Sequence, residues 1–171
     1  MFDRFILSPA KTDEAPVIWQ LLQSAIQKRK EEGSQQWQDG YPNLQVVQED
    51  IKNEYAYVAK NEEGNICGYM AIITEKEPAY EKEGVRWLTQ RPYVVIHRLA
   101  TDQRNPIKGL ATWMMKSLEN ISLKKGCLSI KADTDFDNVG MLRVFDKMGY
   151  TYCGIVILRG AERKAFEKRL D

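Results

Sequence analysis

The first half of the chain begins with a strand-like segment and continues with two helical ones. Residues 2–7 form a short, mostly apolar run, which predicts a first strand. Apolar residues then recur at intervals of three and four, so we expect a helix that Thr12 or Asp13 caps and Gly33 ends. The shorter apolar stripe over residues 44–51 predicts a second helix.

The middle of the chain predicts a hairpin and then a separate strand. Residues 55–60 and 66–74 are expected to be partner strands, because a polar turn with a glycine, residues 61–65, lies between them. Residues 75–92 are charged and contain two prolines, so they form a connection. Val94, Val95 and Ile96 are strong strand formers, so residues 93–100 predict the clearest strand of the chain.

The second half of the chain alternates helical stripes with strands, and glycines mark the helix ends. Gly126 and Gly149 each follow an apolar stripe at helical spacing, a position where glycine commonly ends a helix. The expected elements are a helix over residues 110–121, a strand over residues 127–132, a helix over residues 141–148, a strand over residues 150–158, and one more strand in the polar tail from Arg159.

This order of elements defines the expected fold class. Hairpin pairing in the first half is antiparallel, whereas the strand–helix–strand units of the second half imply parallel neighbours joined by right-handed crossovers. We therefore expect an α/β (α+β) fold with a mixed, mostly antiparallel sheet and helices on both faces. A length of 171 residues is typical of a single domain, so residues 1–171 are expected to form one.

Composition and charge exclude several classes of protein. With 43% hydrophobic and 29% charged residues, the chain has an ordinary globular composition rather than a disordered one. Its net charge of +1 disfavours a nucleic-acid binder, and neither a targeting signal nor a membrane-length apolar run is visible. Cys67, Cys127 and Cys153 are widely spaced and accompanied by one histidine, so we expect reduced core thiols, a cytoplasmic protein and no metal site.

Four segments of the second half occur in an order that carries a family resemblance. They are residues 95–102 (VIHRLATD), residues 108–111 (KGLA), residues 129–133 (SIKAD) and residues 138–150, which end in Met-Gly-Tyr. On these segments the chain resembles the GNAT superfamily of acyl-CoA-dependent N-acyltransferases. The order of the expected elements matches that family over the whole chain.

The resemblance implies an N-acetyltransferase that moves an acetyl group from acetyl-CoA to a primary amine by direct attack, through a tetrahedral intermediate and without a metal. The expected partners are acetyl-CoA as cosubstrate and a small-molecule amine or a peptide as acceptor. Nucleic acid and membrane are not expected, and a homodimer is left open. A non-catalytic acyl-CoA-binding or sensing module and a protein-interaction domain are the alternatives. The implied cofactor-binding residues are Leu99, Ala100, Thr101, Arg104, Lys108, Gly109, Leu110, Ala111, Thr112, Asn138 and Phe145.

The turn before residue 110 has the chemistry of an anion site. Gly109 lets backbone N–H groups approach a phosphate, the helix N-terminus adds partial positive charge, and Lys108 and Arg104 add mobile cations. Taken alone, Gly109 is explained better as the flexible residue of a strand-to-helix turn than as part of an anion site. Members of the family normally carry Arg or Gln where this chain has Pro106, whose missing N–H removes or displaces one phosphate contact.

Asn138 and Phe145 belong to the last expected helix. Asn138 opens it as an N-cap, and in the family an Asn here also faces the pantetheine arm. Both roles fit only if the backbone rather than the amide does most of the capping. Phe145 lies on the apolar face, where core packing explains it. Many family members carry a Tyr at this position that protonates the leaving thiolate, which Phe cannot do. In this chain the proton comes from water or from another hydroxyl, or the step needs no dedicated acid.

His97 is the single histidine, and two interpretations of it stay open. Alternation along the strand points it away from Ile96 and Arg98, which allows a half-buried structural histidine. It is also a candidate general base, because an amine of pKa about 10.4 arrives as ammonium and an imidazole can take its proton. The arylalkylamine branch of the family has a histidine at the same offset from the strand end. A carboxylate acting through water, Glu31 or Asp39, is the competing base.

Trp37 and Tyr41 lie in the loop between the first two helices. In the family this loop commonly walls the acceptor pocket. Two large aromatic side chains among glutamines suit a small amphipathic amine. We therefore expect Trp37 and Tyr41 to bind the acceptor.

Overall fold

The computed structural model describes residues 1–171, and these residues form two compact units. The first unit comprises residues 1–72 and 98–114, and the second comprises residues 73–97 and 115–171. Neither unit is therefore a continuous segment of the chain. That residues 1–171 make up a single N-acetyltransferase domain stays a prediction.

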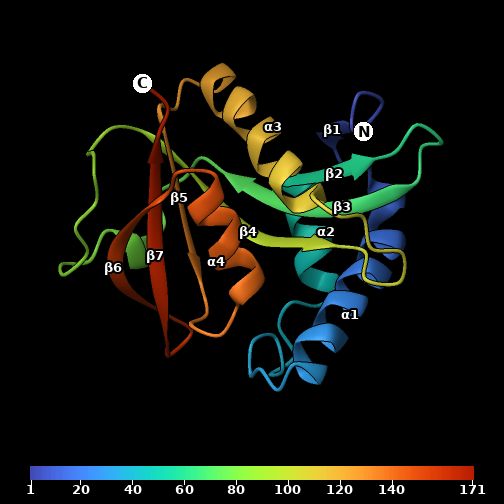
Figure 1. Cartoon of the computed structure of the whole chain (residues 1–171), viewed down its shortest axis with the longest axis horizontal. Coiled ribbons are helices and arrows are strands. Elements are labelled where there is room, and N and C mark those ends of the chain that lie inside the picture. Colours follow the sequence, from blue (N-terminus) through green and yellow to red (C-terminus); the bar gives the residue numbers. More distant parts are fainter. The chain divides into compact units, whose positions relative to one another are not determined.

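Helices and strands alternate along the chain much as the hydrophobic pattern predicts (Figure 1). Two single-turn 3-10 helices, Thr12–Glu14 and Pro78–Tyr80, supplement the longer elements. The α-helices are α1 (Ala15–Glu31), α2 (Leu44–Lys52), α3 (Leu110–Lys124) and α4 (Val139–Lys147). The strands are β1 (Ile6–Pro9), β2 (Ala56–Lys60), β3 (Ile66–Ile73), β4 (Tyr93–Thr101), β5 (Ser129–Thr134), β6 (Thr151–Leu158) and β7 (Ala161–Arg169).

The first strand begins later than its apolar run predicts. Phe2 and Phe5 lie outside β1, and their rings pack against each other and against Trp113 of α3, with centroids 5.1 to 5.8 Å apart. These apolar residues are thus buried against a helix rather than in a strand. The polar tail, in contrast, forms β7 as expected.

The strands form a seven-stranded sheet in the order β1-β2-β3-β4-β5-β7-β6. β2 pairs antiparallel with β1 and with β3, as the hairpin signal predicts. β4 and β5 are parallel, from Tyr93 opposite Ser129 to Ile96 opposite Ala132, and α3 is their crossover. The predicted fold class, a mixed and mostly antiparallel sheet combined with helices, is confirmed.

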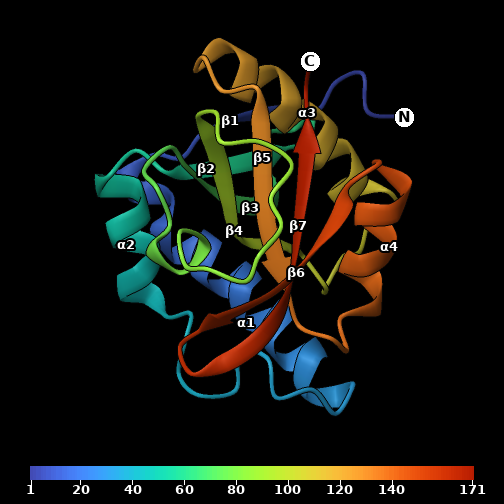
Figure 2. The same cartoon turned by 90° about the vertical axis from the view of Figure 1, so that its left-hand side faces the viewer.

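One predicted pairing is wrong, because β5 and β6 are not parallel neighbours although α4 connects them. β7 lies between them and pairs antiparallel with both (Figure 2). The cause is a two-residue turn in which Leu158 faces Ala161, while Arg159 and Gly160 have φ values of +47° and +74°. A turn with two positive φ values matches the twist of a hairpin, so β7 folds back along β6. It is then β7, and not β6, that pairs with β5.

Each unit has its own hydrophobic core. In the first unit, fully buried side chains such as Ile18 of α1 and Tyr69 of β3 pack together. In the second unit, Tyr80 from the connection between β3 and β4 packs in one cluster with Val156 of β6. The connection, residues 75–92, is therefore a packed part of the second unit despite its many charges.

The backbone of β4 is irregular at Arg98. This residue has a φ of +57°, a conformation uncommon for any residue with a side chain. The regular alternation of side chains expected from Ile96 to Arg98 therefore does not continue across this position. Arg98 belongs to the first unit, whereas Tyr93 to His97 of the same strand belong to the second.

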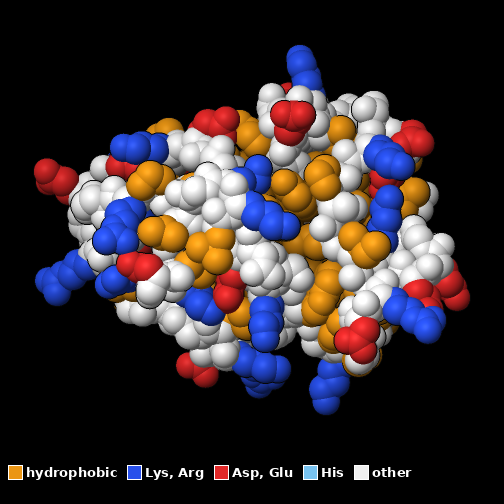
Figure 3. All heavy atoms as spheres, turned by 90° about the horizontal axis from the view of Figure 1, so that it is seen from above, with side chains coloured by type: hydrophobic (Ala, Val, Ile, Leu, Met, Phe, Trp, Pro, Cys, Tyr) orange, Lys and Arg blue, Asp and Glu red, His pale blue; other side chains and the backbone are white.

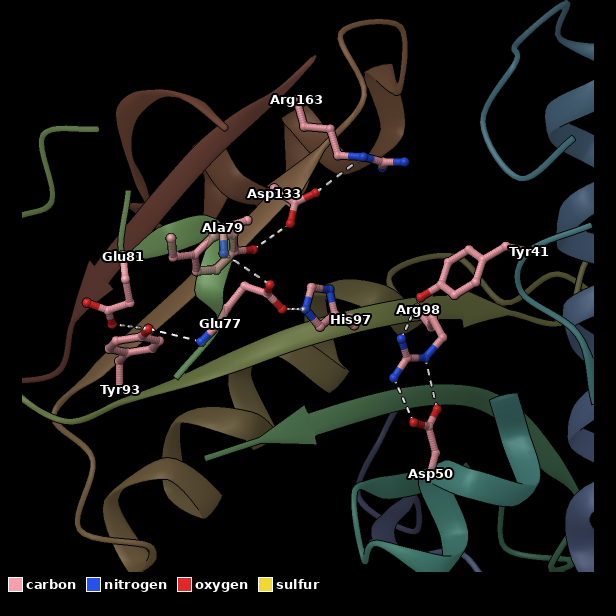
Figure 4. Close-up of polar contacts among 11 residues, drawn as sticks. Tyr41, Asp50, Glu77, Ala79, Glu81, Tyr93, His97, Arg98, Asp133 and Arg163 are labelled. Atoms are coloured by element: carbon pink, nitrogen blue, oxygen red, sulfur yellow. Dashed lines mark hydrogen bonds and ion pairs between the residues drawn. The ribbon is translucent and has the colours of Figure 1, made fainter. Parts of the chain in front are cut away.

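A buried polar network holds the Arg98 side chain. Its Nε and Nη2 donate to the two carboxylate oxygens of Asp50 at 2.9 and 2.7 Å, and its Nη1 donates to Tyr41 Oη at 2.6 Å (Figure 4). Tyr69 donates a further hydrogen bond to Asp50. Burial alone would lower the pKa of Arg98, but Tyr41 and Asp50 raise it by more, so the guanidinium stays charged. Arg98 is thus a structural charge of the first unit.

The surface and the thiols agree with the composition. On the face drawn in Figure 3, Lys and Arg side chains lie among Asp and Glu side chains, as a net charge of +1 leads one to expect. No helix is long and apolar enough to cross a membrane. The three cysteines are buried and form no disulfide, and burial raises the pKa of Cys153 to about 11. That thiol is protonated at neutral pH, which fits a core residue.

The variant Asp50→Ala tests how strongly the first unit depends on the ion pair with Arg98. We expect a loss of about 3–5 kcal/mol in the free energy of unfolding, because the guanidinium stays buried without its counter-charge. Urea denaturation followed by circular dichroism measures this loss. The double variant Asp50→Leu/Arg98→Met removes both charges and should lose less than the single variant. Equal losses in both variants would attribute the stability to packing alone.

Candidate functional site

His97, in the second unit, contacts a carboxylate that the sequence pattern did not reveal. Its Nε2 lies 3.2 Å from Glu77 Oε2, and both residues are half-buried (Figure 4). Glu77 is itself fixed, since Oε1 accepts from Ala79 N at 3.3 Å and its backbone N–H donates to Tyr93 Oη at 3.2 Å. Tyr93 in turn donates to Glu81 at 2.7 Å. These bonds hold the carboxylate in place beside the imidazole.

Tyr80 lies beside His97 and is part of a second group of polar contacts. The two rings lie 6.4 Å apart, centroid to centroid, and the Tyr80 hydroxyl donates to Asp133 of β5. Burial, together with the charge of Asp133, raises the pKa of Tyr80 well above its ordinary value. Asp133 also forms an ion pair of 3.8 Å with Arg163 of β7. Tyr80 is therefore a protonated hydrogen-bond donor and not a base.

Gly109 lies in the first unit, directly before α3. It is exposed and has a φ of +83°. Apart from its chain neighbours, the nearest atom to a Cβ built there would be Phe2 Cε2 at 3.7 Å. The backbone of the turn is therefore open to solvent at the helix N-terminus, and it fits the approach of a pyrophosphate.

Of the two cations expected beside Gly109, Arg104 is paired with a carboxylate and Lys108 is not. Arg104 donates from Nε and Nη2 to the two oxygens of Asp102, each at 2.9 Å, and this pairing lowers the pKa of Asp102. Arg104 is therefore not the mobile cation that we predicted. Lys108 is exposed and forms no ion pair, so it is the more available of the two. Pro106 is exposed as well and offers no N–H.

The other first-unit candidates lie at the end of β4 and in the first turn of α3. Ala100 and Leu110 are only 5% and 1% exposed, so their side chains belong to the core. Only their backbone groups can serve a ligand. The half-buried candidates are Leu99, Thr101, Ala111 and Thr112.

Asn138 and Phe145 lie in the second unit, on α4. The predicted cap is present, but Asn138 Oδ1 accepts from Met141 N at 3.1 Å. The condition under which Asn138 could both cap α4 and face a pantetheine arm is therefore not met, because its amide oxygen makes the cap bond. Phe145 is 1% exposed, and its ring lies 4.5 Å from that of Phe166 and 5.2 Å from that of Tyr150. It is a core residue of the second unit without a hydroxyl to offer.

The two aromatic residues of the loop between α1 and α2 are both held by the first unit. Trp37 is partly buried and packs against the core that includes α1. Tyr41 accepts the hydrogen bond from Arg98 described above. Their role in acceptor binding stays a prediction.

The competing carboxylates are solvent-exposed members of the first unit. Glu31 accepts from Gln27 Nε2 at 3.1 Å, one helical turn earlier. Asp39 accepts from Tyr41 N at 3.4 Å within its own loop. Neither contact orients a base toward a reacting group.

Sequence reasoning found His97 and missed its partners. Glu77 lies 20 residues earlier, in a connection where more than half of the residues are charged or polar, so spacing gave no signal for it. Tyr80 in the same connection has its hydroxyl partner on β5, a pairing that only the fold creates. No group of three or more His, Cys, Asp or Glu side chains could hold a metal ion.

Comparisons with known proteins match this architecture. The family model described as Acetyltransferase (GNAT) family matches residues 19–150. An acetyltransferase of the GNAT family from Streptococcus agalactiae has 33% sequence identity and a TM-score of 0.88, over 100% of this chain and 98% of that one. A comparison with curated proteins gives no match.

Two further solved structures share the fold at lower identity. A GNAT-family acetyltransferase from Listeria monocytogenes has 18% identity and a TM-score of 0.76, over 97% of this chain and 95% of that one. The structure of yncA from Salmonella typhimurium with its cofactor acetyl-CoA has 13% identity and a TM-score of 0.70, over 99% and 95% of the two chains. At such identities the likeness supports the fold alone.

The assignment rests on the family model, which spans most of the sequence, and on the Streptococcus structure, which is similar over the full length. The parallel β4–α3–β5 unit and the open glycine turn before α3 agree with it. The chain therefore belongs to the acetyltransferase (GNAT) family and is an enzyme that uses acetyl-CoA as its cosubstrate.

Proposed function

We propose that the enzyme is an N-acetyltransferase in which a primary amine attacks the thioester carbonyl of acetyl-CoA directly. The observation that carries the proposal is the 3.2 Å contact between His97 Nε2 and the Glu77 carboxylate. It gives β4 an oriented imidazole. An amine acceptor needs such a group, because an aliphatic amine of pKa about 10.4 is mostly ammonium at neutral pH and cannot attack.

The contact also supports a choice of the reacting nitrogen of His97 in this proposal. An ionised carboxylate only accepts hydrogen bonds, so we assign the ring proton to Nε2, where Glu77 accepts it. In this tautomer Nδ1 carries the lone pair and takes the proton of the incoming ammonium, directly or through water. The imidazolium that forms is stabilised by the Glu77 charge. Glu77 is in this proposal a positioning residue.

Acetyl-CoA supplies the acyl group as a thioester. In our proposal its pyrophosphate binds at Gly109, Lys108 and the N-terminus of α3, where backbone donors and helix polarity favour an anion. The backbone near Leu99 and Thr101 pairs with the pantetheine amides as an added strand would. The N–H near Leu99 donates to the carbonyl oxygen as negative charge develops there. On α4, Asn138 stays in the proposed cofactor-binding set, and Phe145 supports the helix from the core.

Release of the thiolate needs little help in this scheme. Phe145 cannot donate a proton. A thiol has an ordinary pKa of about 8.5, so its thiolate is a modest base that water can protonate. We therefore propose turnover without a dedicated general acid.

A non-catalytic acyl-CoA-binding module is the second candidate function. It is favoured by three features: Pro106 lacks an N–H, Arg104 is already paired with Asp102, and Phe145 has no hydroxyl. Release of CoA thiol in the presence of a panel of amines separates the two functions. Binding of acetyl-CoA without release under any acceptor would support the module.

We place the enzyme in the cytoplasm and propose a small-molecule amine or a peptide as its acceptor. The three buried, unpaired thiols support a reducing compartment. Trp37 and Tyr41 are the proposed acceptor contacts. Whether two copies associate is left to measurement of the mass in solution.

Acetyl-CoA should raise the melting temperature of the enzyme, because it binds the native state only. At 100 times Kd the stabilisation is about 2.7 kcal/mol. Gly109→Val should abolish this shift, since a side chain would block the open turn. The control Gly126→Val carries similar strain, with a φ of +76°, just beyond the other end of α3. Both variants should lose about 1–2 kcal/mol, yet only Gly126→Val should keep the shift. An unchanged shift in Gly109→Val would locate the pyrophosphate elsewhere.

The variant His97→Ala should reduce turnover most near neutral pH. The expected loss is on the order of 10²-fold, because water can relay part of the proton transfer. At high pH the amine deprotonates by itself, so the loss should shrink. Steady-state rates of CoA release across the pH range measure this profile.

Matched variants separate the base from its competitors. Glu77→Gln keeps the shape of the partner but removes its charge, so its loss should follow the same pH profile and be smaller. Glu31→Gln and Asp39→Asn should leave the profile of the parent enzyme unchanged. An equal loss for His97→Ala at every pH would give His97 a positional role, and no loss would transfer the base to one of the carboxylates.

A further inference from the structure

A cavity of about 400 Å³ lies within the second unit and has no part in the proposed reaction. Its walls come from the connection between β3 and β4 and from the strands beneath it, with Tyr80, Trp87, Tyr93 and Lys131 among the lining residues. Figure 2 shows this connection passing in front of β5 and β7. Bonds from Arg86 N to Cys153 O and from Trp87 Nε1 to Tyr80 O fix the connection there.

Lys131 of β5 is the unusual group in this cavity. The residue is only 4% exposed, although lysine is rarely buried without a partner. Its Nζ lies 4.0 Å from the centroid of the Tyr93 ring and 4.4 Å from that of Trp87. The ammonium is thus held between two aromatic faces, at the wall of the cavity.

The acidic groups around Lys131 are bonded elsewhere. Glu167 of β7 accepts from Ser129 Oγ at 2.6 Å and from the backbone N–H of Leu88. Glu81 accepts from the Tyr93 hydroxyl. Lys131 itself makes no hydrogen bond and no ion pair with a carboxylate. The two cation–π contacts, each about 0.5–2 kcal/mol, leave the three N–H donors of the ammonium without a protein acceptor at the cavity wall.

The remaining charges of the cavity wall favour an anion. Besides Lys131, the lining includes Lys76, Lys82 and Arg91, of which Arg91 already pairs with Asp171 at 2.6 Å, and Glu81 is the single acid of the lining. Burial lowers the pKa of Lys131, although the charges of Glu167 and Glu81 oppose that effect. An anion in the cavity would offset the cost of burial and complete the coordination of the ammonium.

We propose that this cavity is a binding site for a small organic anion, whose carboxylate or phosphate group pairs with Lys131 Nζ and whose apolar part lies against Trp87 and Tyr93. A volume near 400 Å³ is in the range of small-ligand pockets. Small-ligand pockets combine aromatic walls with a few placed polar groups, and here Trp87 and Tyr93 supply the aromatic wall and Lys131 the charge beside it. The proposal does not depend on which amine the enzyme acetylates.

Titration of the full chain with benzoate, phenyl phosphate and the neutral benzyl alcohol tests the site. The indole N–H signal of Trp87 in a nitrogen-15 NMR spectrum reports from the cavity wall. We expect a saturable shift with benzoate or phenyl phosphate, and the stronger of the two identifies the anionic group. Benzyl alcohol should bind about 10-fold or more weakly, because it lacks the charge that pairs with Lys131.

Two variants locate the anion. Lys131→Met keeps the length of the side chain between the rings and should weaken binding about 10-fold or more. Gly109→Val should bind the anions as the parent chain does, which excludes the turn before α3 as their site. No saturable shift, equal binding of benzyl alcohol, or unchanged binding in Lys131→Met would each overturn the proposal. If Lys131→Met does not fold, the comparison with benzyl alcohol on the unchanged chain decides.

Discussion

The bidentate ion pair between Arg98 and Asp50 is the constraint on which the course of β4 depends. A residue with a side chain at a φ of +57° persists only where its surroundings hold it. Here the surroundings are two charge-assisted bonds to a carboxylate that is itself bonded to Tyr69, together with the bond to Tyr41. The first unit thus stabilises a backbone conformation that ends the regular part of β4 directly after His97.

His97 consequently lies at the last regular position of a buried strand, and its orientation comes from outside that strand. Glu77 provides this orientation, and Glu77 is itself held by hydrogen bonds with the backbone of Ala79 and with Tyr93. A proton acceptor benefits from this arrangement because the carboxylate fixes one tautomer and stabilises the charged ring. In the reaction that we propose, the departures from the family pattern at Pro106 and Phe145 would affect cofactor binding and thiolate release, whereas proton removal from the amine would depend on neither.

The sequence predicted the elements better than their partners. Hydrophobic periodicity located the α-helices and most of the strands, because burial of one face governs both, but it placed the first strand over residues 2–7 where the structure has Ile6–Pro9. The position of β6 was mispredicted because the turn signal of Arg159 and Gly160 lies in a polar tail without a strong strand pattern. Glu77 could not be found by any spacing rule, since its partner is set by tertiary packing of a charged connection. Lys131 is a similar case, because the fold, and not sequence spacing, brings the Trp87 and Tyr93 rings to its ammonium.

That connection, residues 75–92, accounts for both unusual features of the second unit, and Tyr93 belongs to each of them. Its hydroxyl accepts from the backbone of Glu77 and donates to Glu81, while the face of its ring lies 4.0 Å from Lys131 Nζ. A hydrogen bond tolerates only small changes in distance and angle before it weakens. Because one residue serves both features, a change at Tyr93 would affect the hydrogen bond that helps to fix Glu77 and the aromatic wall beside Lys131 together.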